Sequence, residues 1–175
     1  MMLDIARLML FPALMAFVAA SDLFTMTISN RISLALIAGF LVMAPLSGMG
    51  LNDFLMHLGA GATVLAVAFA CFAIGQVGGG DAKIASCVAL WFGFGHIMEF
   101  LLCASLFGGA LTLLVIYIRQ WPLPSPLTGQ AWLLRLHDKQ SRVPYGIALT
   151  FGALMVYPET DWIRAVDLTH FAALH

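Results

Sequence analysis

Two of the nine acidic residues stand where an apolar stretch of the sequence meets a short polar segment. Asp22 closes the first apolar stretch, and Asp81 opens a later one directly after the run Gly78-Gly79-Gly80. If both stretches cross a membrane, the two carboxylates lie at about the same depth on different helices. An ionisable side chain at such a boundary is costly unless it faces water or a partner, so each is a functional candidate. The competing interpretation is a carboxylate that caps a helix or reaches into lipid headgroups.

Paired carboxylates suit one kind of chemistry in particular. Like charges a few ångströms apart do not both ionise cheaply, so the pair tends to share one proton. The ionised member can then take a proton from water while the protonated member polarises a peptide carbonyl, as in aspartic proteases. The other hydrolytic patterns are missing, because the sequence contains neither GxSxG nor HExxH. Its three cysteines form no CxxC pair, which excludes a tetracysteine zinc site.

The glycine run before Asp81 has two interpretations. Glycine permits positive φ and close backbone approach, which predicts a sharp turn that presents Asp81 on the first turn of a helix. The helix dipole favours negative charge at that position. A phosphate-binding loop needs GxxxxGK[ST] or GxGxxG, and neither is present. Lys83, two residues further on, is near enough to tune Asp81 or to bind a substrate carboxylate, or it extends to lipid headgroups.

The composition places these residues in a membrane protein. Of the 175 residues, 62% are hydrophobic and 10% are charged, against roughly 25% charged residues in a soluble domain. The mean hydropathy is +0.97. A net charge of -1 supplies no basic field for polyanions. These values exclude a cytosolic enzyme, a disordered protein and a free nucleic-acid binder, and the length suits one domain over residues 1–175.

The elements that must position the two carboxylates are membrane-spanning helices. Windows of about 20 apolar residues predict an all-α polytopic fold with about six spans, at residues 5–20, 32–46, 54–75, 82–94, 97–118 and 143–157. An outer amino terminus puts most of the Lys and Arg residues on the inner side, as the positive-inside rule requires. These are Arg31, Lys83, Arg119, Arg135, Lys139 and Arg142, against Arg7 and Arg164 outside. The inner loop 119–142 contains an amphipathic stretch, 131–136, expected to lie among the headgroups.

Two further functions compete with proteolysis. A transport or proton-relay protein would use the same buried acids, but it needs polar residues that continue through the bilayer. The predicted spans offer almost none, and Glu99 lies at the far end within reach of His96. A non-enzymatic assembly factor of a secretion machine is the other alternative, and it predicts that replacing either Asp22 or Asp81 leaves function intact.

Three segments of the chain resemble the motifs of type IV prepilin peptidases, the membrane aspartic proteases of bacteria with a GxGD motif. One of these is Gly78-Gly79-Gly80-Asp81-Ala82-Lys83, which resembles the GxGD segment. Another is Val143-Pro144-Tyr145-Gly146-Ile147-Ala148, which resembles the closing V/I-P-Y-G-x-A segment. The first motif, D-x-x-x-x-x-I-P-N, is resembled by Asp22 followed by Ile28 and Asn30. The chain departs from it at Ser29, where Pro is usual, and at Phe24 and Met26, where basic residues are common.

The resemblance implies a role for each matching residue. It implies that Asp22 and Asp81 are the catalytic pair and that the active-site loop consists of Gly78, Gly79, Gly80 and Lys83. It implies substrate-binding or structural roles for Asn30, Pro144, Tyr145 and Gly146.

The resemblance also implies a substrate and a location. Such an enzyme cuts prepilins after a Gly, between a short hydrophilic leader and an apolar helix, at the cytoplasmic face of the bacterial inner membrane. The amino terminus is then periplasmic. We expect a single domain without the extra cytoplasmic region of methylating members and with no separate methyltransferase or zinc domain, because the chain resembles the short form that serves Flp/Tad pilus systems. The expected partners are prepilins, pseudopilins, membrane lipid and pilus or secretion assembly machinery. Neither nucleic acid, a metal nor another cofactor is expected.

Overall fold

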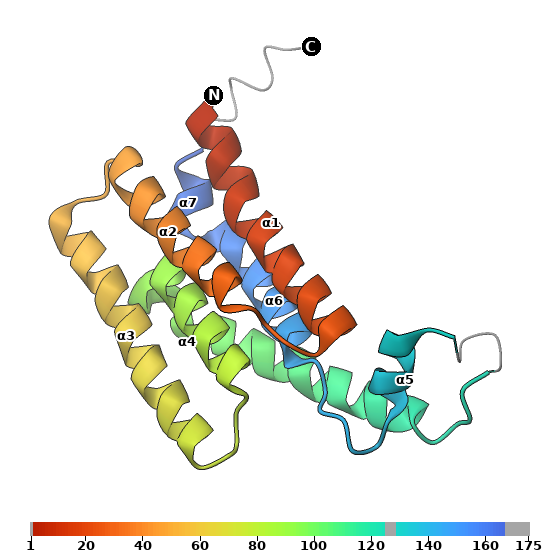
Figure 1. Ribbon diagram of the computed structural model, residues 1–175. Helices are drawn as coiled ribbons and strands as arrows, with labels where there is room; N and C mark the ends of the chain where they lie inside the picture. Colours follow the sequence, from red (N-terminus) through yellow and green to blue (C-terminus); the bar gives the residue numbers. More distant parts are fainter. Residues whose placement is uncertain (1, 125–128, 167–175) are drawn as a thin grey trace, which may run out of the picture.

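The computed structural model describes residues 2–124 and 129–166 of the chain, and this part is built from helices without a strand. The elements in order are α1 (Met2–Thr25), α2 (Asn30–Leu46), α3 (Leu51–Ala73), α4 (Gly79–Ile118), α5 (Ala131–His137), α6 (Tyr145–Val156), the 3-10 turn η2 (Tyr157–Glu159) and α7 (Asp161–Arg164). The all-α prediction is confirmed. The start of α1 and α7 lie at one end of the bundle, and the connections after α1 and α3 and before α6 lie at the other (Figure 1).

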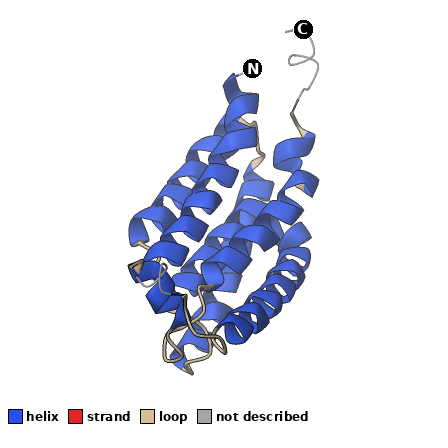
Figure 2. Cartoon of the chain, turned by 90° about the vertical axis from the view of Figure 1, so that its right-hand side faces the viewer, coloured by secondary structure: helices blue, strands red, loops and turns tan. Residues whose placement is uncertain are grey.

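Length and composition make several of these helices suitable for a membrane. Among the described residues, α1, α3 and α4 are long and apolar enough to cross a bilayer, and α2 is a shorter apolar helix. The long helices run side by side, with loops gathered mainly at one end (Figure 2). Large apolar side chains face outward along them, among them Phe17, Leu65, Leu106 and Leu113. These features are those of a membrane protein, while six crossings and an outer amino terminus stay predictions.

α4 combines two of the predicted spans, 82–94 and 97–118. Its backbone turns at Gly93, where φ is 64° and ψ is -177°, a conformation that only glycine adopts readily. We call residues 79–92 the first arm of α4 and residues 94–118 its second arm. The sequence predicted the break at Gly95-His96, two residues too late, because hydropathy responds to the polar His96 and not to the backbone.

Replacing Gly93 by Ala is expected to destabilise the fold by about 2 kcal/mol, because the new residue would occupy a glycine-only conformation. The added Cβ would also lie 3.0 Å from Nε2 of His57, whose Nδ1 is 2.9 Å from the Leu90 carbonyl oxygen. Thermal unfolding in detergent should therefore show a lower Tm. Gly95→Ala is the control, since its Cβ would meet nothing within 4 Å. Equal Tm values for the two variants would contradict the proposed strain.

The core consists of apolar side chains and lies in the middle of the bundle, between its two ends. The inward face of α1 carries Phe11, Met15 and Val18, each 0% exposed. Trp91 of the first arm is also fully buried, and its indole N–H donates to the Leu36 carbonyl of α2 over 2.9 Å. The middle of the molecule is thus closely packed and apolar on the side of α1.

Described residues of the connection between α4 and α6 contact the end of α1 and the end of α4. In α5, the Trp132 ring makes an edge contact with Phe24 at 5.6 Å between centroids, and Arg135 donates to the Phe24 carbonyl. Arg119, at the end of α4, donates to the carbonyls of Leu136 and Ser141 over 2.8 and 3.1 Å. The predicted stretch 131–136 is therefore helical, and its neighbours place the segment that leads into α6. A position among lipid headgroups stays a prediction.

Candidate active site

Asp22 lies in the final turns of α1, buried to 6% exposure. The predicted span ended at residue 20, but the helix continues through Asp22 to Thr25, so the carboxylate belongs to the helix and does not follow it. The backbone N–H of Gly146, in the first turn of α6, donates to its Oδ2 over 2.6 Å. A Cβ on Gly146 would lie 2.8 Å from the same oxygen. Glycine at this position lets the start of α6 rest directly on the carboxylate.

Asp81 lies in the first turn of α4, and the glycines before it serve close packing. Gly78 has φ -69° and ψ 140°, which any residue adopts, but its Cβ would lie 2.6 Å from Oδ2 of Asp81. A Cβ on Gly80 would lie 3.3 Å from Cβ of Ile28. The positive φ that the sequence suggested for this run occurs at Gly75, where φ is 79°. The prediction of close approach is thus confirmed for this run, and its turn belongs to an earlier glycine.

The two carboxylates line one cavity of about 280 Å³. The segments that meet there are the end of α1 with residues 26–28, the start of α4, and residues 142–145 before and at the start of α6. Asp22 and Asp81 lie within electrostatic range of each other. The structure therefore brings together the segments that carry the three sequence motifs. The residues that the sequence predicted for the site and that line this cavity are Asp22, Gly78, Gly79, Gly80, Asp81, Pro144 and Tyr145.

Tyr145 is held by tight packing between α6 and the second arm of α4, and Pro144 directly before it is fully buried. The Tyr145 ring lies directly over Gly108, where no side chain would fit, and its hydroxyl donates to the Ala104 carbonyl over 3.3 Å. A Cβ on Gly152 would lie 2.7 Å from the backbone nitrogen of Ala104. Small residues allow this close approach of two helices. It fixes the start of α6, and hence the amide that binds Asp22.

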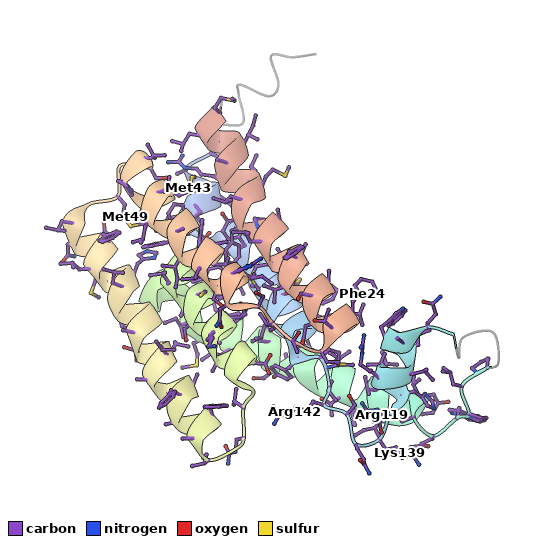
Figure 3. All side chains as sticks on the ribbon, viewed as in Figure 1. Phe24, Met43, Met49, Arg119, Lys139 and Arg142 are labelled. Carbon is purple, nitrogen blue, oxygen red and sulfur yellow. The ribbon has the colours of Figure 1, made fainter. Side chains whose placement is uncertain are left out.

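The sequence did not single out Arg142, which is the one Lys or Arg side chain among the described residues that line the cavity. Its guanidinium attracts the Asp81 carboxylate, and Nη1 lies 3.9 Å from the position of a Cβ on Gly78. It lies at the same end of the bundle as Phe24 and Arg119, with Met43 and Met49 at the other (Figure 3). The available signal was its position two residues before Pro144, directly ahead of the third motif.

Lys83 and Asn30 are not among the residues that line this cavity. The Lys83 ammonium donates to Oδ1 of Asn30 over 2.8 Å, so it is directed to α2 and not to Asp81. Both side chains border a separate groove of about 540 Å³ between α2, α3 and the first arm of α4. The predicted active-site group is thus divided between a cavity and a neighbouring groove.

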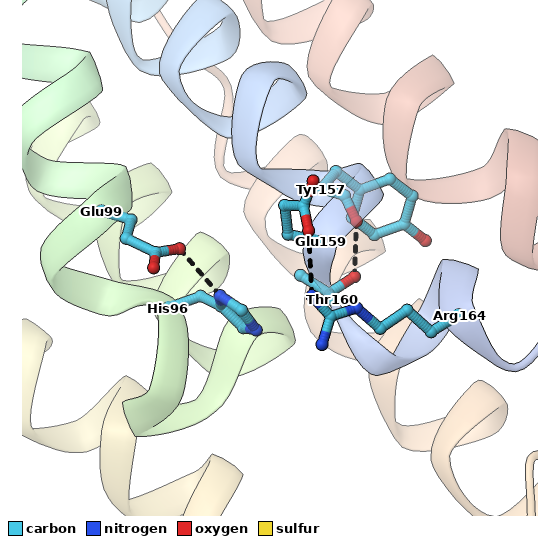
Figure 4. Close-up of polar contacts among 6 residues, drawn as sticks. All are labelled: His96, Glu99, Tyr157, Glu159, Thr160 and Arg164. Carbon is cyan, nitrogen blue, oxygen red and sulfur yellow. Dashed lines mark hydrogen bonds and ion pairs between the residues drawn. The ribbon is translucent and has the colours of Figure 1, made fainter.

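The opposite end of the bundle carries a different set of polar contacts (Figure 4). His96 Nδ1 lies 2.9 Å from Glu99 Oε2, and Arg164 donates to Glu159 over 2.9 Å. The His96–Glu99 contact agrees with their predicted proximity. Within residues 2–124 and 129–166, no group of three or more His, Cys, Asp or Glu side chains is arranged to hold a metal ion.

Comparison with known proteins identifies the family. Residues 9–113, more than half of the chain, match the model of the type IV leader peptidase family. The match contains Asp22, Gly78, Gly80 and Asp81 and ends before Pro144. No curated protein and no solved structure matches the chain. The chain belongs to the type IV leader peptidase family, whose members are prepilin leader peptidases, hydrolases of the aspartic type in the inner membrane.

Proposed function

We propose that the protein cleaves Flp-type or type IV-like prepilins after a Gly at the cytoplasmic boundary of the membrane, with Asp22 and Asp81 activating the attacking water. The observation that carries the proposal is that carboxylates from two different helices line one cavity, each against the backbone of a glycine. The substrates would meet the protein in the membrane, before their transfer to pilus or secretion assembly machinery.

The proposed reaction is a direct attack of water on the scissile amide. The ionised carboxylate takes a proton from water, whose oxygen forms a bond to the carbonyl carbon, while the protonated carboxyl group donates to the carbonyl oxygen. Collapse of the tetrahedral intermediate breaks the C–N bond. The amine leaves with a proton from the carboxyl group that the water had protonated, and the other carboxylate recovers its proton from one hydroxyl of the intermediate, which restores the starting pair. The leader departs as a carboxylic acid with Gly at its end. A helical amide is shielded from attack, so the substrate must be extended at this bond.

Transport is less well supported than proteolysis. A proton path along α1 from Asp22 toward the opposite end of the bundle would have to reach Arg7. The two residues are 15 positions apart, which corresponds to about 22 Å along a helix axis. The inward face of α1 between them carries Phe11, Met15 and Val18, all fully buried. A proton path along this face would have to cross an apolar, closely packed layer.

A cleavage assay in membranes tests the proposed function. The substrate is a Flp-type prepilin with Gly before its apolar segment, and mass spectrometry of the product locates the new amino terminus. We expect cleavage after that Gly and much slower cleavage when the Gly is replaced by Leu. Cleavage elsewhere would contradict the proposed site. Absence of cleavage with a dissipated proton gradient in vesicles would favour the transport alternative.

Replacing Arg142 by Gln is expected to lower the cleavage rate by about tenfold, because the guanidinium offsets the negative charge of the carboxylate pair across a partly exposed site. Arg142→Lys should recover most of the rate, since it restores the charge. Lys139→Gln is the matched control: it removes an exposed cation from the same connection without touching the cavity. If Arg142→Gln and Lys139→Gln behave alike, the charge beside Asp81 has no role in the reaction.

A further inference from the structure

A groove lies between α2 and α3 although the two helices are neighbours in sequence. α3 packs along α4, whereas it meets α2 little beyond their short connection, and α3 leans away from α2 toward the end that carries the active site (Figure 1). The first arm of α4 forms the floor. The side chains along the groove are mainly apolar, including Leu34 and Ile37 of α2, Leu58 and Leu65 of α3, and Leu90 of α4.

The groove begins where the cavity ends. Ile28 and Asp81 line the cavity, and two residues further along each segment Asn30 and Lys83 line the groove. Between them the Ile28 side chain rests against the Gly80 backbone, with 3.3 Å from Cβ of Ile28 to the position of a Cβ on the glycine. A peptide that leaves the cavity on this side therefore passes the Ile28–Gly80 contact and the Lys83–Asn30 hydrogen bond before it enters the groove.

We propose that this groove binds the apolar helix of the substrate that follows the scissile bond. The inference rests on the proposed function, which places the scissile bond beside Asp81. Residues 83–90 of α4, which border the groove, rise by about 10 Å, so two turns of a substrate helix fit along it. The exposed Ala62 of α3 lies on its wall, and a small residue lets a second helix backbone come close, whereas the neighbouring Gly61 is buried against Leu90 of α4. The Lys83–Asn30 pair forms its polar end at the membrane boundary.

A second groove provides the comparison. It lies between the second arm of α4 and α6, has a volume of about 210 Å³, and includes Ala110, Leu114 and Phe151. It also runs toward the active site, since Ile147 and Ala148 follow Gly146. The α2–α3 groove is the larger of the two at about 540 Å³. A substrate helix in it would gain more apolar contact.

Filling the groove tests the proposal kinetically. Ala62→Trp is expected to raise KM for a complete prepilin by about tenfold, because lost uniform binding changes KM and leaves kcat. The Ala62→Trp protein should cut a short peptide that spans the cleavage site but lacks the apolar helix as fast as the wild type does. Ala110→Trp, an exposed position in the second groove, is the matched control and should change neither value. An increase in KM with Ala110→Trp alone, or with neither variant, overturns the proposal.

Photo-crosslinking gives a second and independent readout. Benzoylphenylalanine replaces Leu34, Leu65 or Leu114 in an Asp81→Asn protein, which keeps the substrate uncleaved. The first two positions should crosslink to the apolar segment of the prepilin, and Leu114 should not. Crosslinks from Leu34 and Leu65 to lipid alone, or to prepilin from Leu114 alone, overturn the proposal. Failure of the proposed function itself is separate, because the unsubstituted protein would then leave the prepilin uncut.

Discussion

Replacing Asp81 by Asn is expected to reduce prepilin cleavage by about a thousandfold or more, because a positioned group that transfers protons contributes 10²–10⁴-fold to a rate. Asparagine has nearly the volume of aspartate, so packing against Gly78 is retained while the amide can neither take up nor donate the proton. Asp22→Asn should have an effect of the same size. Initial rates are compared at equal amounts of membrane-inserted protein.

The control for both variants is Asp53→Asn, which removes a carboxylate from the opposite end of the bundle, in the first turn of α3. It should cleave at the rate of the wild type. Because residues that act as one unit have non-additive effects, the double variant Asp22→Asn/Asp81→Asn should be hardly slower than either single variant. A single variant that keeps its rate within tenfold would show that its carboxylate is structural.

The sequence was sufficient to select Asp22 and Asp81 because charged residues are scarce in an apolar chain. Their positions at the ends of apolar stretches indicated a common depth, and the helices place both beside one cavity. Arg142 could not be selected in the same way. It lies in a connection whose path depends on hydrogen bonds from Arg119 and on contacts of α5 with Phe24, and such tertiary contacts leave no local pattern.

The glycines show a second limit of sequence reasoning. Gly78 and Gly93 look alike as letters, but Gly93 is required for its positive φ and Gly78 for the space beside a carboxylate. A sequence offers both explanations for every glycine. Only the backbone angles and the neighbouring atoms separate them. The sequence therefore predicts the turn before Asp81 at Gly78–Gly80, whereas the positive φ occurs at Gly75. The sequence also leaves several roles open for Lys83, because its partner Asn30 is 53 positions away.

Replacing Gly146 by Ala is expected to lower the cleavage rate by about a hundredfold, the effect that a displacement of roughly 1 Å can have on a reacting group. The added Cβ would stand 2.8 Å from Oδ2 of Asp22, so either the carboxylate or the start of α6 must move. Gly78→Ala should act similarly on Asp81, whose Oδ2 would lie 2.6 Å from the new Cβ. Rates are measured on prepilin, together with Tm in detergent.

These glycine variants separate the position of the carboxylates from their presence. Both acids remain in Gly146→Ala, and alanine favours a helix more than glycine does, so the stability of α6 should not fall for reasons of propensity. Gly109→Ala is the control, because its Cβ would meet nothing within 4 Å, and it should keep both rate and Tm. A normal rate for Gly146→Ala would mean that Asp22 adjusts freely and that its contact with α6 does not set the reaction geometry. A loss of rate with an unchanged Tm would assign the glycine to the position of the acid, a conclusion that removal of the acid alone cannot give.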